Sequence, residues 1–138
     1  MTPDEIVVEV PSDWMSGMGD HGMRAPIPVL RMYDVDATKR FYVDYLGFNL
    51  DWQDGEGDRP IYMRVSRGPV ALHLSSHAGD GTPGTAIVIQ VEDVAALHRE
   101  LHGKNYPFMN PGIEPRGIGQ EVTVLDPASN QVRFFEPG

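Results

Sequence analysis

The side chains through which this chain could do chemistry include five histidines, and two pairs of them are closely spaced. His98 and His102 lie four residues apart on one face of a predicted helix, a spacing at which two imidazoles can bind a zinc ion. The simpler interpretation places His102 on the helix surface and leaves His98 half-buried. His73 and His77 are also four residues apart, but the first belongs to a predicted strand and the second to a loop. We therefore expect neither pair to form a metal site.

Several other reaction chemistries are excluded by what the sequence lacks. The chain has no cysteine, which excludes a disulfide framework, a thiol nucleophile and a thiolate metal site. No glycine cluster lies between a strand and a helix, as a phosphate-binding loop requires, and no serine lies on a nucleophile elbow. His73 remains a candidate for contact with a bound molecule, or alternatively a histidine satisfied within the sheet. These observations favour binding over catalysis.

The charge and hydropathy of the chain indicate which partners to expect. Its 138 residues carry a formal net charge of −9, which argues against nucleic acid, since phosphates require a face of Lys and Arg. The acidity favours a cationic partner, or alternatively serves only solubility. No apolar run approaches the ~20 residues needed to span a bilayer, and several acidic residues precede the first basic one, Arg24, unlike a secretion signal. We expect a cytoplasmic protein with no membrane or nucleic-acid partner.

The chain repeats one pattern of elements. Residues 27–75 are predicted to run strand, short helix and further strands, and residues 86–136 repeat that order. The two predicted helices open alike, with Asp34-Val35 in the first copy and Asp93-Val94 in the second. Two such modules usually pair and leave a cleft between them, which is where small molecules bind.

The expected elements follow from periodicity, capping residues and turn signals. In the first module they are a strand at Ile27–Tyr33, a helix from Asp34 or Asp36 to Leu46, and strands at Phe48–Trp52, Pro60–Ser66 and Pro69–Ser76. In the second they are a strand at Ala86–Val91, a helix capped by Asp93 and ended by Gly103, an irregular stretch at Tyr106–Gly119, and strands at Glu121–Leu125 and Gln131–Glu136. Before both modules, Glu5–Val10 could add an edge strand, and Ser12–Met23 is expected to be a loop.

Alternation along these strands separates two faces. One face is apolar throughout and should pack under the helices, whereas the other mixes aromatic, charged and amide side chains. With helices on one side only, the mixed face would line a trough, and its composition is typical of a small-molecule site. The ligand-binding residues predicted on this face are Trp52, Tyr62, Arg64, His73, Gln90, Arg133 and Phe135. A wider aromatic wall would add Phe108 and Met109, although core or dimer packing is the alternative for these rings.

Three stretches resemble the vicinal oxygen chelate superfamily, which includes glyoxalase I, extradiol dioxygenases, and fosfomycin- and bleomycin-resistance proteins. They are Val29–Val35 continued by Phe41-Tyr42 and Leu46-Gly47-Phe48, then Val88–Val94, then Asp126-Pro127 with Asn130 and the strand ending in Phe135-Glu136. The resemblance covers about residues 26–137. It implies an α+β fold of two paired βαβββ modules forming a cup-shaped mixed β-sheet. The modules would span about residues 26–77 and 85–137, joined by a linker at 78–84 and preceded by an extension at 1–25.

The resemblance also bears on metal binding. In metal-dependent members, four cup-facing positions on the first and last strands of each module supply His or Glu ligands. Strand register carries these positions onto Ile27, His73, Ala86 and Arg133, of which only His73 can bind a metal. The resemblance is therefore to the metal-free bleomycin-resistance branch, whose members are acidic homodimers that bind the drug at the subunit interface. It implies no metal, no cofactor and no catalytic residue.

We expect a non-catalytic homodimer that binds and sequesters a small molecule such as a bleomycin-type antibiotic, a route to antibiotic resistance. The acidic charge suits a cationic glycopeptide, whereas Arg31, Arg64 and Arg133 in the trough suit an anionic or carboxylate-bearing ligand, or internal pairing with Glu121. The alternative function is a metal-dependent glyoxalase-like lyase or transferase that uses displaced ligands such as His73 and Glu121. A third is a regulatory binding protein whose residues 1–24 contact a partner.

Overall fold

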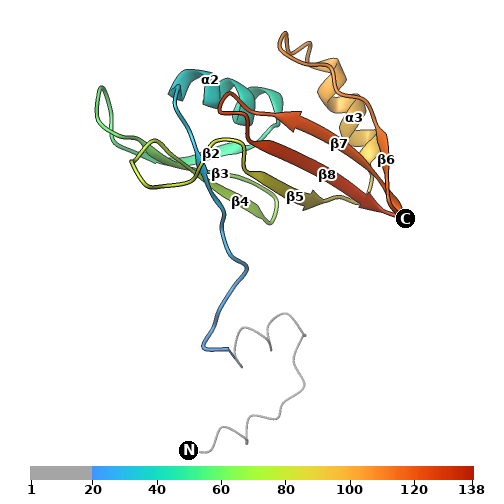
Figure 1. The fold of residues 1–138 in the computed structure, drawn as a ribbon, viewed down its shortest axis with the longest axis horizontal. Helices are drawn as coiled ribbons and strands as arrows, with labels where there is room; N and C mark the ends of the chain where they lie inside the picture. Colours follow the sequence, from blue (N-terminus) through green and yellow to red (C-terminus); the bar gives the residue numbers. More distant parts are fainter. Residues whose placement is uncertain (1–19) are drawn as a thin grey trace, which may run out of the picture.

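The computed structural model describes residues 20–138, which form two modules in succession along the chain (Figure 1). The first contains β1 (Val29–Arg31), α2 (Val35–Lys39), η2 (Arg40–Tyr45), β2 (Asn49–Asp54), β3 (Tyr62–Arg67) and β4 (Val70–Ser75). The second contains β5 (Ala86–Gln90), α3 (Val94–Gly103), β6 (Glu114–Arg116), β7 (Gly119–Leu125) and β8 (Gln131–Pro137). The predicted strand at Glu5–Val10 and most of the predicted loop at Ser12–Met23 lie outside the described residues.

Each module builds its own four-stranded mixed sheet, and the predicted α+β fold is confirmed. The strand order is β1-β4-β3-β2 in the first sheet and β5-β8-β7-β6 in the second. In both sheets the first strand of the module runs parallel to the last one, and the remaining pairs are antiparallel. The two modules therefore share one topology, as the repeated sequence pattern predicts.

Both helical segments begin as the sequence predicts. Asp34 Oδ1 accepts a hydrogen bond from the amide of Ala37 at 2.9 Å, and Asp93 Oδ1 accepts one from Ala96 at 2.9 Å. Such caps satisfy an amide that has no partner within the helix and contribute about 1 kcal/mol each. The choice between Asp34 and Asp36 is thereby settled in favour of Asp34. Gly47, with φ of +74°, ends the first helical segment in the left-handed conformation that glycine adopts without strain.

Two elements differ in kind from the sequence-based expectation, and β1 is shorter than the strand predicted at Ile27–Tyr33. The second half of the first helix, η2, is a π-helix in which the amide of Leu46 donates to the carbonyl of Phe41 at 2.9 Å. A hydrophobic pattern over six residues cannot distinguish this wider turn from an α-turn, since both bury the same aromatic side chains. The stretch Tyr106–Gly119 is not wholly irregular, because β6 pairs with β7. Pro115 is accommodated in β6 because this short strand is at the edge of the sheet.

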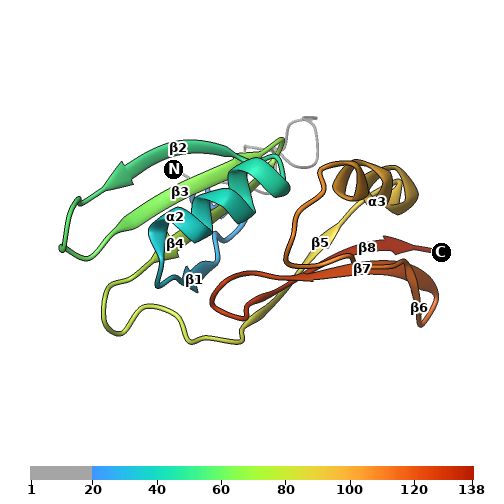
Figure 2. The same ribbon diagram turned by 90° about the horizontal axis from the view of Figure 1, so that it is seen from above.

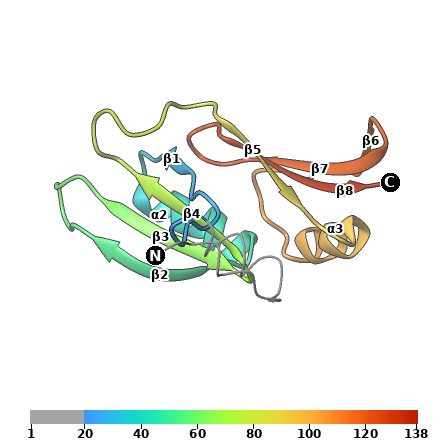
Figure 3. The same ribbon diagram turned by 90° about the horizontal axis from the view of Figure 1, so that it is seen from below.

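The apolar strand faces pack under the helices, as predicted. Met63, Val65, Leu72 and Leu74 of the first sheet are buried, as are Val122, Val124, Val132 and Phe134 of the second. Figures 1 and 2 show α2 and α3 on the same side of the two sheets. The opposite faces, seen from below in Figure 3, carry no helix, and Val29, Trp52, Val88 and Leu125 are each at least a third exposed.

Buried hydrogen bonds join the modules. Tyr42 in η2 donates its hydroxyl to Oδ2 of Asp126, in the turn between β7 and β8, at 2.7 Å. In the same turn, Asn130 donates its side-chain amide to the carbonyl of Arg31 at 2.9 Å. Burial raises the pKa of Tyr42 well above its usual value, and the charge of Asp126 raises it further. The phenol therefore remains a neutral donor.

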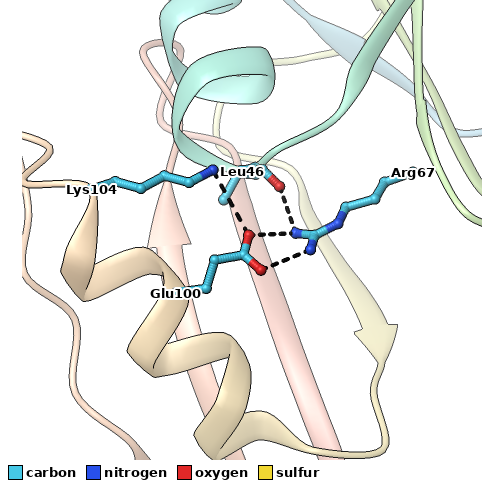
Figure 4. Close-up of polar contacts among 4 residues, drawn as sticks. All are labelled: Leu46, Arg67, Glu100 and Lys104. Carbon is cyan, nitrogen blue, oxygen red and sulfur yellow. Dashed lines mark hydrogen bonds and ion pairs between the residues drawn. The ribbon is translucent and has the colours of Figure 1, made fainter.

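An ion pair joins the modules at a second point (Figure 4). Arg67, at the end of β3, donates Nη1 and Nη2 to the two carboxylate oxygens of Glu100 on α3, at 2.9 and 2.8 Å. Its Nη1 also donates to the carbonyl of Leu46 at 2.9 Å.

Within residues 20–138, no helix is long and apolar enough to cross a membrane.

Candidate functional site

The open face of the first sheet places three of the predicted ligand-binding residues in one row. In the strand register, Trp52 lies opposite Arg64, Arg64 opposite His73, and His73 opposite Val29. Directly opposed side chains in such a ladder have Cβ atoms about 5 Å apart, so the row forms a continuous surface. Tyr62, two residues before Arg64 on β3, lies on the same face.

Aromatic rings form the centre of this surface. The rings of Trp52 and Tyr62 stack with centroids 5.9 Å apart and an interplanar angle of 11°. The ring of His73 meets both edge-on, at 5.4 Å from Trp52 and 5.1 Å from Tyr62. Trp52 is 44% exposed, so a flat molecule can stack on this group without displacing other side chains.

Burial and a neighbouring charge keep His73 neutral near pH 7 by lowering its pKa. The hydroxyl of Tyr62 lies 2.6 Å from Nδ1 of His73. Burial lowers the pKa of His73, and the neighbouring charge of Arg64 lowers it further. The pKa of Tyr62 is raised by burial and by the charge of Asp80, so its hydroxyl remains protonated. When the hydroxyl donates to Nδ1, the imidazole carries its own proton on Nε2 and presents a hydrogen-bond donor.

Acidic side chains surround the aromatic group. Nε of Arg64 lies 3.3 Å from Oδ2 of Asp51, although this contact lacks the alignment of a hydrogen bond. Asp54 lies opposite Tyr62 in the register, and the charge of Asp80 reaches the Tyr62 hydroxyl. Because Asp51 offsets the charge of Arg64, the surroundings of the rings are acidic.

The open face of the second sheet holds the other three predicted residues. Gln90 lies opposite Phe135, and Arg133 lies between Val88 and Thr123. Arg133 and His73 occupy equivalent positions, since each is on the last strand of its module and faces a valine of the first strand. The seven predicted residues are therefore divided between two sheets, four on the first and three on the second.

Arg31, Arg64 and Arg133 were the arginines expected to pair with Glu121, but the arginine that contacts Glu121 is Arg116. Glu121 is buried, and its Oε1 lies 3.3 Å from Nη2 of Arg116 and accepts a hydrogen bond from Thr123 at 2.8 Å. Arg133 instead donates Nε and Nη2 to the amide oxygen of Gln131, at 3.1 and 2.8 Å. A pocket of about 420 Å³ opens beside it, lined by Glu114, Arg116, Thr123, Leu125, Gln131 and Arg133.

The residues present do not fit the divalent cation of metal-dependent relatives. The register places Val29 beside His73 and Val88 beside Arg133. Ile27 lies two residues before Val29, outside β1, and Ala86 lies two residues before Val88, at the start of β5. None of these four partners has a lone pair to donate, and the guanidinium of Arg64 lies beside the single imidazole. His73 and Glu121, the alternative ligands, lie on different sheets. Among residues 20–138, no cluster of three or more His, Asp or Glu could hold a metal.

The second histidine pair has a structural role. Nε2 of His98 lies 3.0 Å from the carbonyl of Pro111, and Nδ1 of His102 lies 3.0 Å from Oδ1 of Asn110. The two rings hold the segment after α3 against the helix. His98 is half-buried and His102 is exposed, as predicted.

The prediction that Phe108 and Met109 extend the aromatic wall is wrong. The ring of Phe108 contacts Tyr106, which stacks on Tyr45 of η2 at 4.3 Å, so this segment lies on the helix side of the sheets. Two cavities of about 410 and 450 Å³ lie there, both lined by Arg40, Tyr106 and Phe108. The sequence contains no signal for them, because η2 and the segment after α3 are distant in the chain and the latter has no periodicity.

Two βαβββ modules with uncovered sheet faces define the class of glyoxalase and bleomycin-resistance folds. The sequence model of a family described as "Glyoxalase superfamily protein" matches residues 13–137, and the chain belongs to this superfamily. A search of curated proteins finds no match.

Several solved structures are similar to the chain. One is a bleomycin-binding protein from bleomycin-producing Streptomyces verticillus, complexed with copper(II)-bleomycin; it is 34% identical, with a TM-score of 0.61, over 84% of this chain and 97% of that one. A bleomycin resistance determinant encoded on the transposon Tn5 is 22% identical, with a TM-score of 0.66, over 83% and 98% of the two chains. A glyoxalase/bleomycin resistance protein from Catenulispora acidiphila is 16% identical, with a TM-score of 0.64, over 84% and 100%.

Proposed function

We propose that this protein binds and sequesters a small molecule of the bleomycin antibiotic type on the open faces of its sheets, without catalysing a reaction. The observation that carries the proposal is the exposed stack of Trp52 on Tyr62, with His73 beside it. Rings held in this way bind flat heteroaromatic groups. The 34% identity to the bleomycin-binding protein of Streptomyces verticillus supports the same ligand class.

The charges around the rings suit a cationic ligand. Asp51, Asp54 and Asp80 adjoin the aromatic group, and the whole chain carries a net charge of −9. Acidic surroundings attract a cation over distances of about 10 Å at ordinary ionic strength. When Tyr62 donates to Nδ1, neutral His73 adds an Nε2–H donor, so the surface combines stacking, charge attraction and one oriented hydrogen bond.

A homodimer is part of the proposal. Val29, Val88 and Leu125 on the uncovered sheet faces are at least a third exposed, which leaves apolar surface for a second copy to cover. Residues 20–28 approach β1 from the side opposite the helices, where they are available to a second copy (Figure 1). A ligand held between two copies would be shielded from solvent more completely than one held on a single sheet.

Isothermal titration calorimetry with a bleomycin-type drug, with and without copper(II), tests the function. Trp52→Ala is expected to weaken binding about tenfold or more, the equivalent of ~1.4 kcal/mol, because it removes the stacking surface. Phe108→Ala, which removes an exposed aromatic ring from the helix side, is the matched control and should bind normally. Recovery of the drug unchanged in mass would support sequestration. Full affinity in Trp52→Ala with loss in Phe108→Ala would place the site on the helix side and refute the proposal.

A further inference from the structure

The guanidinium of Arg133 differs from those of Arg64 and Arg116 in its hydrogen-bond partner. Arg64 lies against Asp51, and Arg116 lies against Glu121, so a carboxylate offsets the charge of each. Within the described part of the chain, the side-chain partner of Arg133 is the neutral amide of Gln131. An amide oxygen accepts hydrogen bonds without cancelling charge, and Arg133 therefore keeps its full positive charge.

The same contacts orient the guanidinium. Nε and Nη2 both donate to the one oxygen of Gln131, at 3.1 and 2.8 Å, which holds the plane of the group by one edge. A guanidinium has five N–H donors, so three remain after these two bonds. These three are both N–H groups of Nη1 and one N–H group of Nη2. Nη1 and Nη2 together can bind the two oxygens of a carboxylate through two parallel hydrogen bonds.

The pocket beside Arg133 has room for such a group and suits a single negative charge. Its volume is about 420 Å³, and its walls include Thr123, Leu125 and Gln131 together with the charged Glu114 and Arg116. Within residues 20–138, Arg133 forms no ion pair with buried Glu121, whose Oε1 contacts Arg116 and Thr123 instead. The two arginines and two glutamates sum to zero charge, which disfavours a doubly charged phosphate and permits a monoanion.

We infer that this pocket binds a carboxylate, gripped end-on by Arg133 while Gln131 holds the guanidinium in place. The inference rests on the proposed function and narrows its ligand class to molecules that carry a carboxylate. The positions equivalent by register, His73 and Arg133, thus have different roles, one as a neutral donor and the other as the anion site.

The test compares indole-3-acetate with indole-3-acetamide, two probes of nearly the same shape that differ in charge. The Arg133 Nε–Hε signal is followed by NMR in ¹⁵N-labelled full-length protein, and the indole signal of Trp52 is followed in parallel. The acetate is expected to shift the Arg133 signal in a saturable titration and to bind about tenfold or more tightly than the acetamide. An equal response to both probes, or no response at Arg133, would overturn the inference.

Two variants with matched controls examine the mechanism of anion binding. Gln131→Glu keeps the size of the side chain but sets a carboxylate against Arg133, so preference for indole-3-acetate should disappear; Arg133→Gln should have the same effect. The controls are Gln120→Glu, which adds a negative charge at an exposed position of β7, and Arg99→Gln, which removes a positive charge from the exposed surface of α3. Both control variants should retain the preference for indole-3-acetate. Retention of the preference in Gln131→Glu would refute the proposed grip.

Failure of this inference is distinguishable from failure of the proposed function. If the Trp52 signal responds to a bleomycin-type drug but Arg133 does not respond to indole-3-acetate, the carboxylate site is refuted and the binding function stands. If Arg133 responds to indole-3-acetate while Trp52 is unaffected by the drug, the anion site stands and the proposed antibiotic ligand is wrong.

Discussion

At the scale of single residues, Asp126 connects the two most distinctive sequence motifs. Its Oδ1 accepts hydrogen bonds from the amides of Ala128 and Asn130 at 2.9 and 2.8 Å. Its Oδ2 accepts from the side-chain amide of Asn130 at 2.9 Å and from Tyr42 at 2.7 Å. The Asp126–Asn130 turn and the Phe41-Tyr42 pair, which carry the family resemblance, therefore contact each other. These contacts join the modules, and the proposed ligand surface is made of other residues.

Removal of the Tyr42 hydroxyl tests this junction. Tyr42→Phe should lower the free energy of unfolding by about 1–3 kcal/mol, because Asp126 loses a buried donor that water cannot replace. Urea unfolding of the variant near neutral pH measures the loss. Tyr33→Phe, at a tyrosine that is 62% exposed, should leave stability unchanged. A Tyr42→Phe protein as stable as the wild type would contradict a stabilising role for the hydrogen bond between Tyr42 and Asp126.

The same residue predicts a pH dependence. Because the pKa of folded Tyr42 is raised above 10.0, its ionised form is disfavoured only in the folded state. Its contribution to stability is therefore fully present below pH 10.0 and is lost as the pH rises above that value. The unfolding free energy of the wild type should fall more steeply in alkali than that of Tyr42→Phe, and parallel curves would contradict the raised pKa.

At the scale of elements, the strand register explains how one repeated pattern produces two different surfaces. His73 and Arg133 occupy the same place in their sheets, but His73 has Arg64 opposite it where Arg133 has Thr123. Burial lowers the pKa of His73 and the charge of Arg64 lowers it further, whereas Arg133 faces the uncharged Thr123 and bonds to the amide of Gln131. The repeat therefore sets the positions, and the side chains at those positions set the chemistry of each half.

The contact between β3 and α3 is the element-scale feature most directly tested by mutation. Glu100→Gln should destabilise the protein by roughly 0.5–1 kcal/mol, a modest loss because both partners are about a third or more exposed and screened by solvent. The hydrogen bond from Arg67 is the main cause of the lowered pKa of Glu100, so the stabilisation is present above pH 4.5 and is lost in acid. Urea unfolding near neutral pH and in acid measures both effects.

Lys104→Gln is the control for that experiment. The Lys104 ammonium lies 3.8 Å from Glu100, farther than the bidentate contact of Arg67, and its removal should change stability little. A larger effect for Lys104→Gln than for Glu100→Gln would indicate that the pair with Arg67 does not join the modules in solution.

At the scale of the whole molecule, the helices cover one side of both sheets and leave the other side uncovered (Figure 3). If a second copy covers that side, Val88→Asp should weaken the dimer about tenfold or more, since a carboxylate would be buried against apolar groups. Val88 is 61% exposed, so the substitution is expected to leave the fold intact. Sedimentation equilibrium over a dilution series measures the association. Phe108→Asp, on the helix side, is the control. Dissociation of the dimer in this variant alone would place the interface on the helix side and contradict the proposal.

The local elements could be predicted from the sequence because their causes lie within a few residues. Alternation defined the buried strand faces, Asp34 and Asp93 defined the helix starts, and Gly47 defined a helix end. The shared face of Tyr62 and Arg64 followed from the same alternation, since side chains two residues apart share a face. The row of Trp52, Arg64 and His73 depends in addition on the register between strands, which shifts between Leu50 and Trp52. The local elements depend on backbone geometry and short-range hydrogen bonds, which the order of residues specifies directly.

Only the tertiary structure decided which distant groups become partners. It stacked Tyr106 on Tyr45, placed the Tyr42 hydroxyl against Asp126, and joined Arg67 to Glu100. Each of these contacts depends on where long side chains and irregular segments settle once the sheets are packed, and several partners compete for each of them at similar energy. Such choices are made by the packing of the whole chain, and no local pattern records them.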